Sequence, residues 1–142
     1  MFVHPTKALH CLVSAAVVLA LVGVCIVPLA FARISLNTIN PVAIVTDNGR
    51  HIRVTGPLGC SGSEPAYLRV TVTQRSTGAV AEGSALIACT TDIQQWAVQA
   101  STQGNATFQE GPAVAVALGR TTDRGDTDDA NQWLVNIALV RE

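Results

Sequence analysis

Hydrophobic and polar residues alternate at every second position in several short runs along the chain. The clearest run is 66–75 (AYLRVTVTQR), where leucine and valine fall on one side of a strand and mainly polar residues on the other. Asn48-Gly49 and Thr77-Gly78 are turn signals between neighbouring runs. We expect strands at 41–46, 51–60, 66–75, 79–90, 92–101, 112–119 and 131–141.

The run at 92–101 (DIQQWAVQAS) fits two structures. Gln94, Trp96, Val98 and Ala100 alternate as in a strand, but the apolar residues also fit helical spacing. We expect a strand, because the neighbouring runs are strands and no helix stop signal follows.

Two runs are apolar on both faces. These are 112–119 (PAVAVALG) and 131–141 (NQWLVNIALVR), in which Leu134, Ala138 and Val140 lie opposite the Trp133 side. A strand of this kind belongs in the middle of a covered sheet.

An alternating strand has a core face that must be buried against another layer. We therefore expect an all-β fold: an immunoglobulin-like Greek-key β-sandwich of about seven strands over 41–142, after a short lead-in at 33–40. Both Trp96 and Trp133 follow Cys89, whereas the usual immunoglobulin order places a tryptophan between its two cysteines.

Residues 1–32 have the form of a secretory signal peptide. Lys7 precedes an uncharged apolar stretch at 11–31, and Ala30-Phe31-Ala32 has the small-x-small form of a cleavage site. The stretch is long enough to leave an uncleaved membrane anchor as an alternative. Lipidation at Cys25 is a third reading, although a valine precedes that cysteine where a small residue is preferred.

Removal of the leader leaves two cysteines, Cys60 and Cys89. Two cysteines in a small exported domain predict a disulfide. The bond would close a loop of about 30 residues, worth about 3.5 kcal/mol in the chain-entropy model.

The charge balance excludes some partners. The 142 residues carry 9 Lys+Arg and 10 Asp+Glu, a net charge of −1. Lys7 is the only lysine, so the chain without its leader has 8 Arg against 10 acids, or −2. Such a domain has no basic surface for nucleic acid, and we expect a membrane contact only through an uncleaved leader.

Four carboxylates gather at 120–132 (RTTDRGDTDDANQ): Asp123, Asp126, Asp128 and Asp129. Oxygen donors on one loop suit calcium, but the spacing lacks the final glutamate of the helix–loop–helix calcium pattern. The alternative is a solvated hairpin tip balanced by neighbouring arginines. We expect no other cofactor.

The composition does not favour catalysis. His51 is the one histidine after the leader, on the outward side of its strand, and no serine stands in a G-x-S-x-G turn. An enzyme would require His51 to converge with an acidic residue and a nucleophile. We therefore expect no enzymatic activity.

The best candidate for a contact surface is the outward row of the 66–75 strand. Its residues are Tyr67, Arg69, Thr71 and Thr73. A tyrosine and an arginine between threonines suit contact with a partner, although the same row also fits an ordinary sheet exterior.

A series of short motifs runs through the domain: Gly59-Cys60, the 70–74 strand (VTVTQ), Cys89, Gln95-Trp96, Phe108-x-x-Gly111-x-Ala113 and Trp133-x-Val135. In this order, over about residues 50–140, the chain resembles small secreted β-sandwich proteins of actinobacteria and related bacteria. The function of that group is uncharacterised. The resemblance therefore implies a fold and an exported location but no activity.

Together these patterns predict a secreted, non-catalytic domain with a binding or structural role at or outside the cell surface. Its partner would be an extracellular or cell-surface molecule. One alternative is a small-ligand carrier or inhibitor of the extracellular space, which would need an open apolar cleft lined by Trp96 or Phe108. The other is a membrane-tethered surface module, if the leader is not cleaved.

Overall fold

The computed structural model describes residues 33–142, so the expected signal peptide at 1–32 lies outside the described residues. The described chain is all-β. Its elements are β1 (Arg33–Asn37), β2 (Val42–Thr46), the 3-10 turn η1 (Asp47–Gly49), β3 (His51–Ser61), β4 (Ala66–Gln74), β5 (Ala79–Ile87), β6 (Thr90–Thr102), β7 (Gly111–Asp123) and β8 (Asp126–Arg141). The ambiguous run at 92–101 lies within β6 and is a strand.

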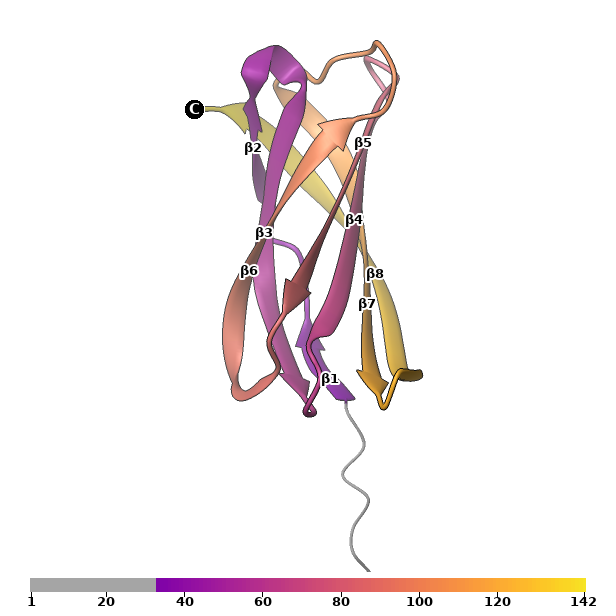
Figure 1. Cartoon of the computed structure of the whole chain (residues 1–142). Helices are drawn as coiled ribbons and strands as arrows, with labels where there is room; N and C mark the ends of the chain where they lie inside the picture. Colours follow the sequence, from indigo (N-terminus) through magenta and orange to yellow (C-terminus); the bar gives the residue numbers. More distant parts are fainter. Residues whose placement is uncertain (1–32) are drawn as a thin grey trace, which may run out of the picture.

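Seven strands form a closed barrel, in the order β3-β2-β8-β7-β4-β5-β6 and back to β3 (Figure 1). The eighth strand, β1, pairs with the last residues of β3. The expected immunoglobulin-like Greek-key β-sandwich is therefore wrong. Alternation along a strand reports which side is buried, and that side is the same in a sandwich and in a barrel; only the pairing between strands distinguishes them.

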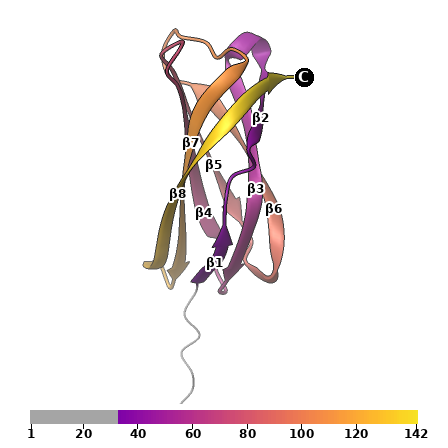
Figure 2. The same ribbon diagram turned by 180° about the vertical axis from the view of Figure 1, so that it is seen from behind.

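Two short pairings close the barrel. In one, Val42–Val45 of β2 run parallel to Ala138–Arg141 of β8, and Figure 2 shows β8 crossing from β7 to β2. In the other, Ala81 and Glu82 of β5 pair with Thr102 and Ser101 of β6. Both pairings lie toward the end of the barrel that carries η1 and the C-terminus.

Gly83 lets β5 approach β6 beside the second of these pairings. A Cβ atom at this position would lie 2.6 Å from the Gln99 carbonyl oxygen and 3.0 Å from the Ala100 Cα. A side chain on β5 would push the two backbones apart, so glycine is needed for close approach here.

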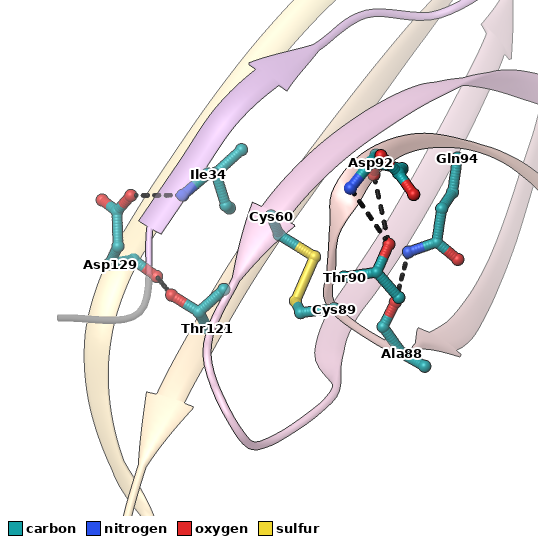
Figure 3. Close-up of a disulfide and its surroundings, with 9 residues drawn as sticks. All are labelled: Ile34, Cys60, Ala88, Cys89, Thr90, Asp92, Gln94, Thr121 and Asp129. Atoms are coloured by element: carbon teal, nitrogen blue, oxygen red, sulfur yellow. Dashed lines mark hydrogen bonds between the residues drawn. A yellow bond between two sulfur atoms is a disulfide. The ribbon is translucent and has the colours of Figure 1, made fainter. Parts of the chain in front are cut away.

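The expected disulfide is present at the opposite end of the barrel (Figure 3). It joins Cys60, near the end of β3, to Cys89 in the short turn before β6, with 5.0 Å between the Cα atoms. The bond thus holds the β5–β6 turn to β3 at the end where β5 and β6 are not paired.

The core lies inside the barrel and is filled by alternate residues of its strands. Leu68, Val70 and Val72 of β4 have no exposed surface, as the alternation predicted. Trp96 and Phe108 are the two largest fully buried side chains. These two side chains therefore do not line the open cleft that a small-ligand carrier would need.

The loop at 103–110, between β6 and β7, closes the end of the barrel that carries η1. Its backbone is held by Gln74, which is 1% exposed: the Gln74 Nε2 donates to the Gln109 carbonyl (2.8 Å), and the Gln109 N–H donates to the Gln74 Oε1 (2.9 Å). The Phe108 N–H donates to the Gly49 carbonyl of η1 (3.0 Å). The side chain of Phe108 is thereby fixed in the core.

The lead-in expected at 33–40 contributes structure of its own. It begins with β1, and the Asn40 N–H donates to the Thr55 carbonyl (2.8 Å). Within residues 33–142, no helix has the length and hydrophobicity to cross a membrane.

Candidate functional site

Four neighbouring strands present one continuous outer face, in which each outward residue lies opposite outward residues of the adjacent strands. We call this the outer face. Its residues are Ala130, Gln132, Leu134 and Asn136 on β8, Val114, Val116, Leu118 and Arg120 on β7, Tyr67, Arg69, Thr71 and Thr73 on β4, and Val80, Glu82, Ser84 and Leu86 on β5. None of the sixteen is buried.

The predicted contact strip, Tyr67, Arg69, Thr71 and Thr73, lies on β4 within this face, between β7 and β5. The structure therefore brings these four residues together, with the side chains of β7 and then β8 on one side and those of β5 on the other. Sequence reasoning missed those flanking residues, because they lie far from β4 along the chain.

Two polar contacts order the strip. The Arg69 Nη2 donates to the Glu82 Oε2 at 2.9 Å, and this hydrogen bond raises the pKa of Arg69 above its ordinary value, helped by the charge of the carboxylate. The Arg120 guanidinium lies 4.8 Å from the centre of the Tyr67 ring. Both contacts lie in the plane of the face and connect β4 to its two neighbours.

The outer face exposes several aliphatic side chains to solvent. Half of its sixteen residues are hydrophobic, and Leu134 and Leu86 are 62% and 68% exposed. The outward positions of β3 and β6 are mostly polar instead, and include His51, Arg53 and Gln99. Large exposed apolar patches on small domains mark interaction surfaces.

Two open hollows flank the centre of the outer face. One has a volume of about 340 Å³ and is lined mainly by apolar atoms, with Thr73, Val114 and Asn136 among its residues. The other, of about 320 Å³, lies over the contact between Arg69 and Glu82. A partner side chain can enter each hollow, and the two differ in polarity.

The predicted acidic cluster does not form one site. Arg124-Gly125 forms a two-residue turn with positive φ at both positions (53° and 88°), which places Asp123 and Asp126 at an exposed hairpin tip. Asp129 accepts a hydrogen bond from the Ile34 N–H at 2.9 Å (Figure 3).

Asp128 has a carboxylate oxygen that is buried without a hydrogen-bond partner. Among residues 33–142, no three His, Cys, Asp or Glu side chains converge on a point where a metal ion would bind. The calcium hypothesis gains no support from this geometry and stays a prediction.

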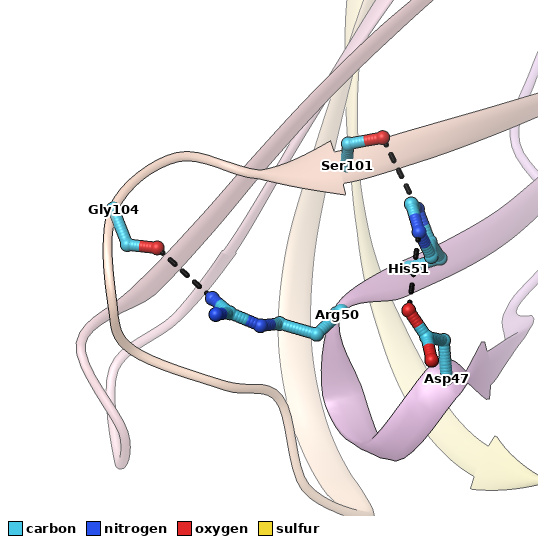
Figure 4. A network of polar contacts seen from close by, with 5 residues as sticks. All are labelled: Asp47, Arg50, His51, Ser101 and Gly104. Atoms are coloured by element: carbon cyan, nitrogen blue, oxygen red, sulfur yellow. Dashed lines mark hydrogen bonds and ion pairs between the residues drawn. The ribbon is translucent and has the colours of Figure 1, made fainter.

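His51 lies between an acid and a hydroxyl (Figure 4), shortly after η1 at the start of β3. Its Nδ1 is 3.1 Å from the Ser101 Oγ on the paired strand β6, and its Nε2 is 3.4 Å from the Asp47 Oδ2 in η1. The sequence indicated an outward histidine but not these partners, because Ser101 is 50 residues away.

The same three residue types act as nucleophile, base and acid in hydrolases. Here the ring nitrogens are used in the opposite sense, with the hydroxyl on Nδ1 and the carboxylate on Nε2. The carboxylate of Asp47 is 63% exposed, so water weakens its pull on the imidazole.

A serine nucleophile also needs N–H donors for the oxyanion that forms on its substrate. Beyond Ser101, the Thr102 N–H donates to the Arg50 carbonyl and the Gln103 N–H to the Val80 carbonyl, so both are occupied. The backbone pair of Ser101 on β5 is Glu82, an acid that would repel a developing negative charge. The two N–H groups that follow Ser101 are therefore not free to bind an oxyanion.

Comparison with known proteins adds no relative. No family model, no curated protein and no solved structure matches this chain. The resemblance to small secreted proteins of actinobacteria therefore stays a prediction, and the function has to be argued from the site.

Proposed function

We propose that the chain is an exported, non-catalytic binding domain that acts at or outside the cell surface and that binds its partner through the outer face. The partner is an extracellular or cell-surface molecule. Membrane tethering through residues 1–32 is compatible with this role, since it would change where the domain is held but not how it binds.

One observation carries the proposal. The segments 112–119 of β7 and 131–141 of β8 carry apolar residues on both faces, as in strands covered on both sides, yet no segment of residues 33–142 buries their outer side. Val114, Val116 and Leu118 of β7 and Leu134 of β8 stay partly or largely exposed. Aliphatic side chains in this arrangement gain free energy when a partner removes them from water, by about 25 cal/mol per Å².

The disulfide supports an exported location for the domain. Bonds between cysteines persist in oxidising compartments, outside the cytosol. Cys60–Cys89 is therefore consistent with the export that the signal-like sequence of 1–32 predicts. The lack of lysine in the domain and its excess of acids still argue against nucleic acid as the partner.

A matched pair of variants tests the proposal in the organism that makes the protein. Leu86→Glu places a charge on the outer face, and Ile93→Glu places one on β6, away from it; the native residues are 68% and 63% exposed. We expect the wild-type protein, recovered from culture medium and envelope fractions, to migrate as a complex larger than the lone domain. Leu86→Glu should release the lone domain, whereas Ile93→Glu should leave the complex intact.

Two outcomes of this comparison would count against the proposal. Equal loss of the complex in both variants, or no complex in any fraction, would contradict the proposal. The intact mass of the recovered protein also separates two locations: a species beginning at Arg33 means secretion, and one retaining residues 1–32 means a tethered module.

A second candidate function is hydrolysis by Ser101. The observation that favours it is the approach of His51 to both Ser101 and Asp47. We expect this function to fail, because the two N–H groups that follow Ser101 are occupied and cannot bind an oxyanion.

Labelling with a fluorophosphonate, which reacts with activated serines, decides the matter. We expect no more labelling of the wild-type protein than of Ser101→Ala, with Ser84→Ala as the exposed-serine control. Labelling that is lost only in Ser101→Ala and His51→Ala would establish an activated nucleophile and overturn the non-catalytic assignment.

A further inference from the structure

We infer that the partner is a polypeptide and that it contributes a short extended segment, which adds as a strand to the free edge of β5 at residues 84–87. This inference rests on the proposed function, because β5 is the last strand of the outer face on this side. It names the kind of partner that the face binds. The pairing of β5, the exposure of its residues and the chemistry of its edge carry the inference.

The backbone of β5 has no partner strand on one side beyond Glu82. β5 pairs with β4 along its whole length without a register shift, but with β6 only at Ala81 and Glu82. Past these two residues β5 and β6 separate, and the rest of β6 runs beside β3 (Figure 1). Within residues 33–142, no other strand pairs with β5 on this side, so residues 84–87 form a free edge in the barrel wall.

The free edge presents two N–H groups and two carbonyls. The Gln103 N–H donates to the Val80 carbonyl at 2.7 Å, so the backbone groups of Val80 point away from β4. In a regular antiparallel strand the N–H and carbonyl of one residue point to the same side, and that side changes at every residue. Ser84 and Leu86 therefore direct their N–H and carbonyl groups to the free side. Another extended backbone offers the matching carbonyls and N–H groups at the same spacing of two residues.

Residues that face the barrel interior stay partly exposed beside this edge. On β4, Leu68 pairs with Ala85 and Ala66 pairs with Ile87. The two β4 residues have no exposed surface, but Ala85 and Ile87 are only partly buried. Ala81, where β5 still has β6 beside it, is fully buried. A strand added to the edge would cover Ala85 and Ile87 as β6 covers Ala81.

The edge lacks the features that usually prevent strand addition. Exposed edges are commonly protected by lysine, proline, inward charges or a bulge. The sequence at 83–88 (GSALIA) has no charge and no proline, and the register between β4 and β5 has no bulge. On the outer side of the edge, Leu86 is 68% exposed. The segment that fits is therefore uncharged, with an aliphatic or aromatic residue beside Leu86.

The edge is bounded at both ends, which limits what can add to it. At one end, a Cβ on Gly83 would touch the Gln99 carbonyl of β6. At the other end, the Gln94 Nε2 donates to the Ala88 carbonyl, and the disulfide fixes the turn that follows (Figure 3). Such an edge admits one short stretch of chain but not the edge of a second folded barrel. We therefore assign it to a segment of another polypeptide rather than to a second copy.

A comparable stretch of β8 already has a neighbour. β8 pairs with β2 only from Ala138 to Arg141, so its earlier residues also lack a partner strand on that side. There, however, β1 lies against β8, and the Ile34 N–H donates to the Asp129 Oδ2 at 2.9 Å. The edge of β5 is therefore the better site for an added strand.

The experiment measures hydrogen–deuterium exchange of single amides in the oxidised protein, first alone and then in the complex recovered from the host fractions. In the lone protein, the amides of Ser84 and Leu86 should exchange at least about tenfold faster than those of Ala85 and Ile87, which bind β4. In the complex, exchange at Ser84 and Leu86 should slow at least about tenfold. The amide of Gly125, at the exposed hairpin tip, should not change.

Two substitutions of Ser84 provide a second readout. Ser84→Pro removes the N–H on the free side and leaves the pairing with β4 intact, and proline is tolerated at such edge positions. We expect Ser84→Pro to weaken the complex at least about tenfold, and Ser84→Thr, which keeps the N–H, to leave it intact. Near-ultraviolet circular dichroism reports whether each variant is folded.

The outcomes separate this inference from the proposed function. Slow exchange of Ser84 and Leu86 in the lone protein, or equally fast exchange of both in the complex, would overturn the inference. A complex that contains only copies of this chain would overturn it as well. Loss of the complex in Leu86→Glu, with those two amides still unprotected in the wild-type complex, would reject the added strand while keeping the outer face as the binding site. The absence of any complex would contradict the proposed function and the inference with it.

Discussion

Replacing Trp96 with alanine is expected to lower the free energy of unfolding by about 3–5 kcal/mol, the range for loss of a large aromatic from a closed core. Trp96 is 2% exposed, and its ring fills the space over Gly56, where an added Cβ would lie 2.7 Å from a ring carbon. Its Nε1 also donates to the Pro57 carbonyl at 3.3 Å. The variant would therefore lose packing and a hydrogen bond together.

The second tryptophan provides the control. Trp133 is only half-buried, and its Nε1 is buried without a hydrogen-bond partner. Trp133→Phe removes that unpaired N–H and should change stability by less than about 1 kcal/mol. Chemical unfolding followed by circular dichroism measures both variants. Equal losses for Trp96→Ala and Trp133→Phe would contradict the assignment of Trp96 to the centre of the core.

Replacing Cys60 with alanine is expected to lower the free energy of unfolding by about 2–5 kcal/mol, because the unfolded chain regains the freedom that the cross-link removes. The bond joins residues 29 positions apart and holds the β5–β6 turn at the end of the barrel where those two strands are unpaired. We therefore expect the loss to include local opening at this turn.

A reducing agent distinguishes the stability that the disulfide contributes from other effects of the Cys60→Ala substitution. A reducing agent should lower the stability of the wild-type protein by a similar amount and leave Cys60→Ala unchanged, as measured by denaturant unfolding with and without it. Wild-type protein that is insensitive to reductant would mean that Cys60 and Cys89 are not bonded in solution.

Much of the local structure could be predicted from the residues. The alternation in 66–75 correctly placed Leu68 and Val70 inside and Arg69 outside, and Asn48-Gly49 marked the turn between β2 and β3. The closure of the barrel could not be predicted. It depends on the parallel contact of β2 with β8, between segments almost a hundred residues apart, and alternation carries no information about such partners.

The candidate site could be predicted only in part, again because alternation along one strand carries no information about its partner strands. The strip on β4 follows from one strand's alternation, whereas its continuation to Leu86 and Leu134 depends on register between strands. One signal was present in the sequence: 112–119 and 131–141 are apolar on both faces. We interpreted this as burial in the middle of a covered sheet, and the structure places both strands in a barrel wall whose outer side is uncovered within the described residues.

The most direct test of the account is hydroxyl-radical labelling of the protein in its host fractions, compared with the purified protein at high dilution. The readout is the oxidation of four exposed aliphatic residues: Leu86 and Leu134 on the outer face, and Val42 and Ile93 elsewhere. If a partner covers the outer face, Leu86 and Leu134 will be protected in the host fractions while Val42 and Ile93 are labelled as in the diluted protein. Equal labelling of all four residues in both samples would contradict the claim that this face binds a partner.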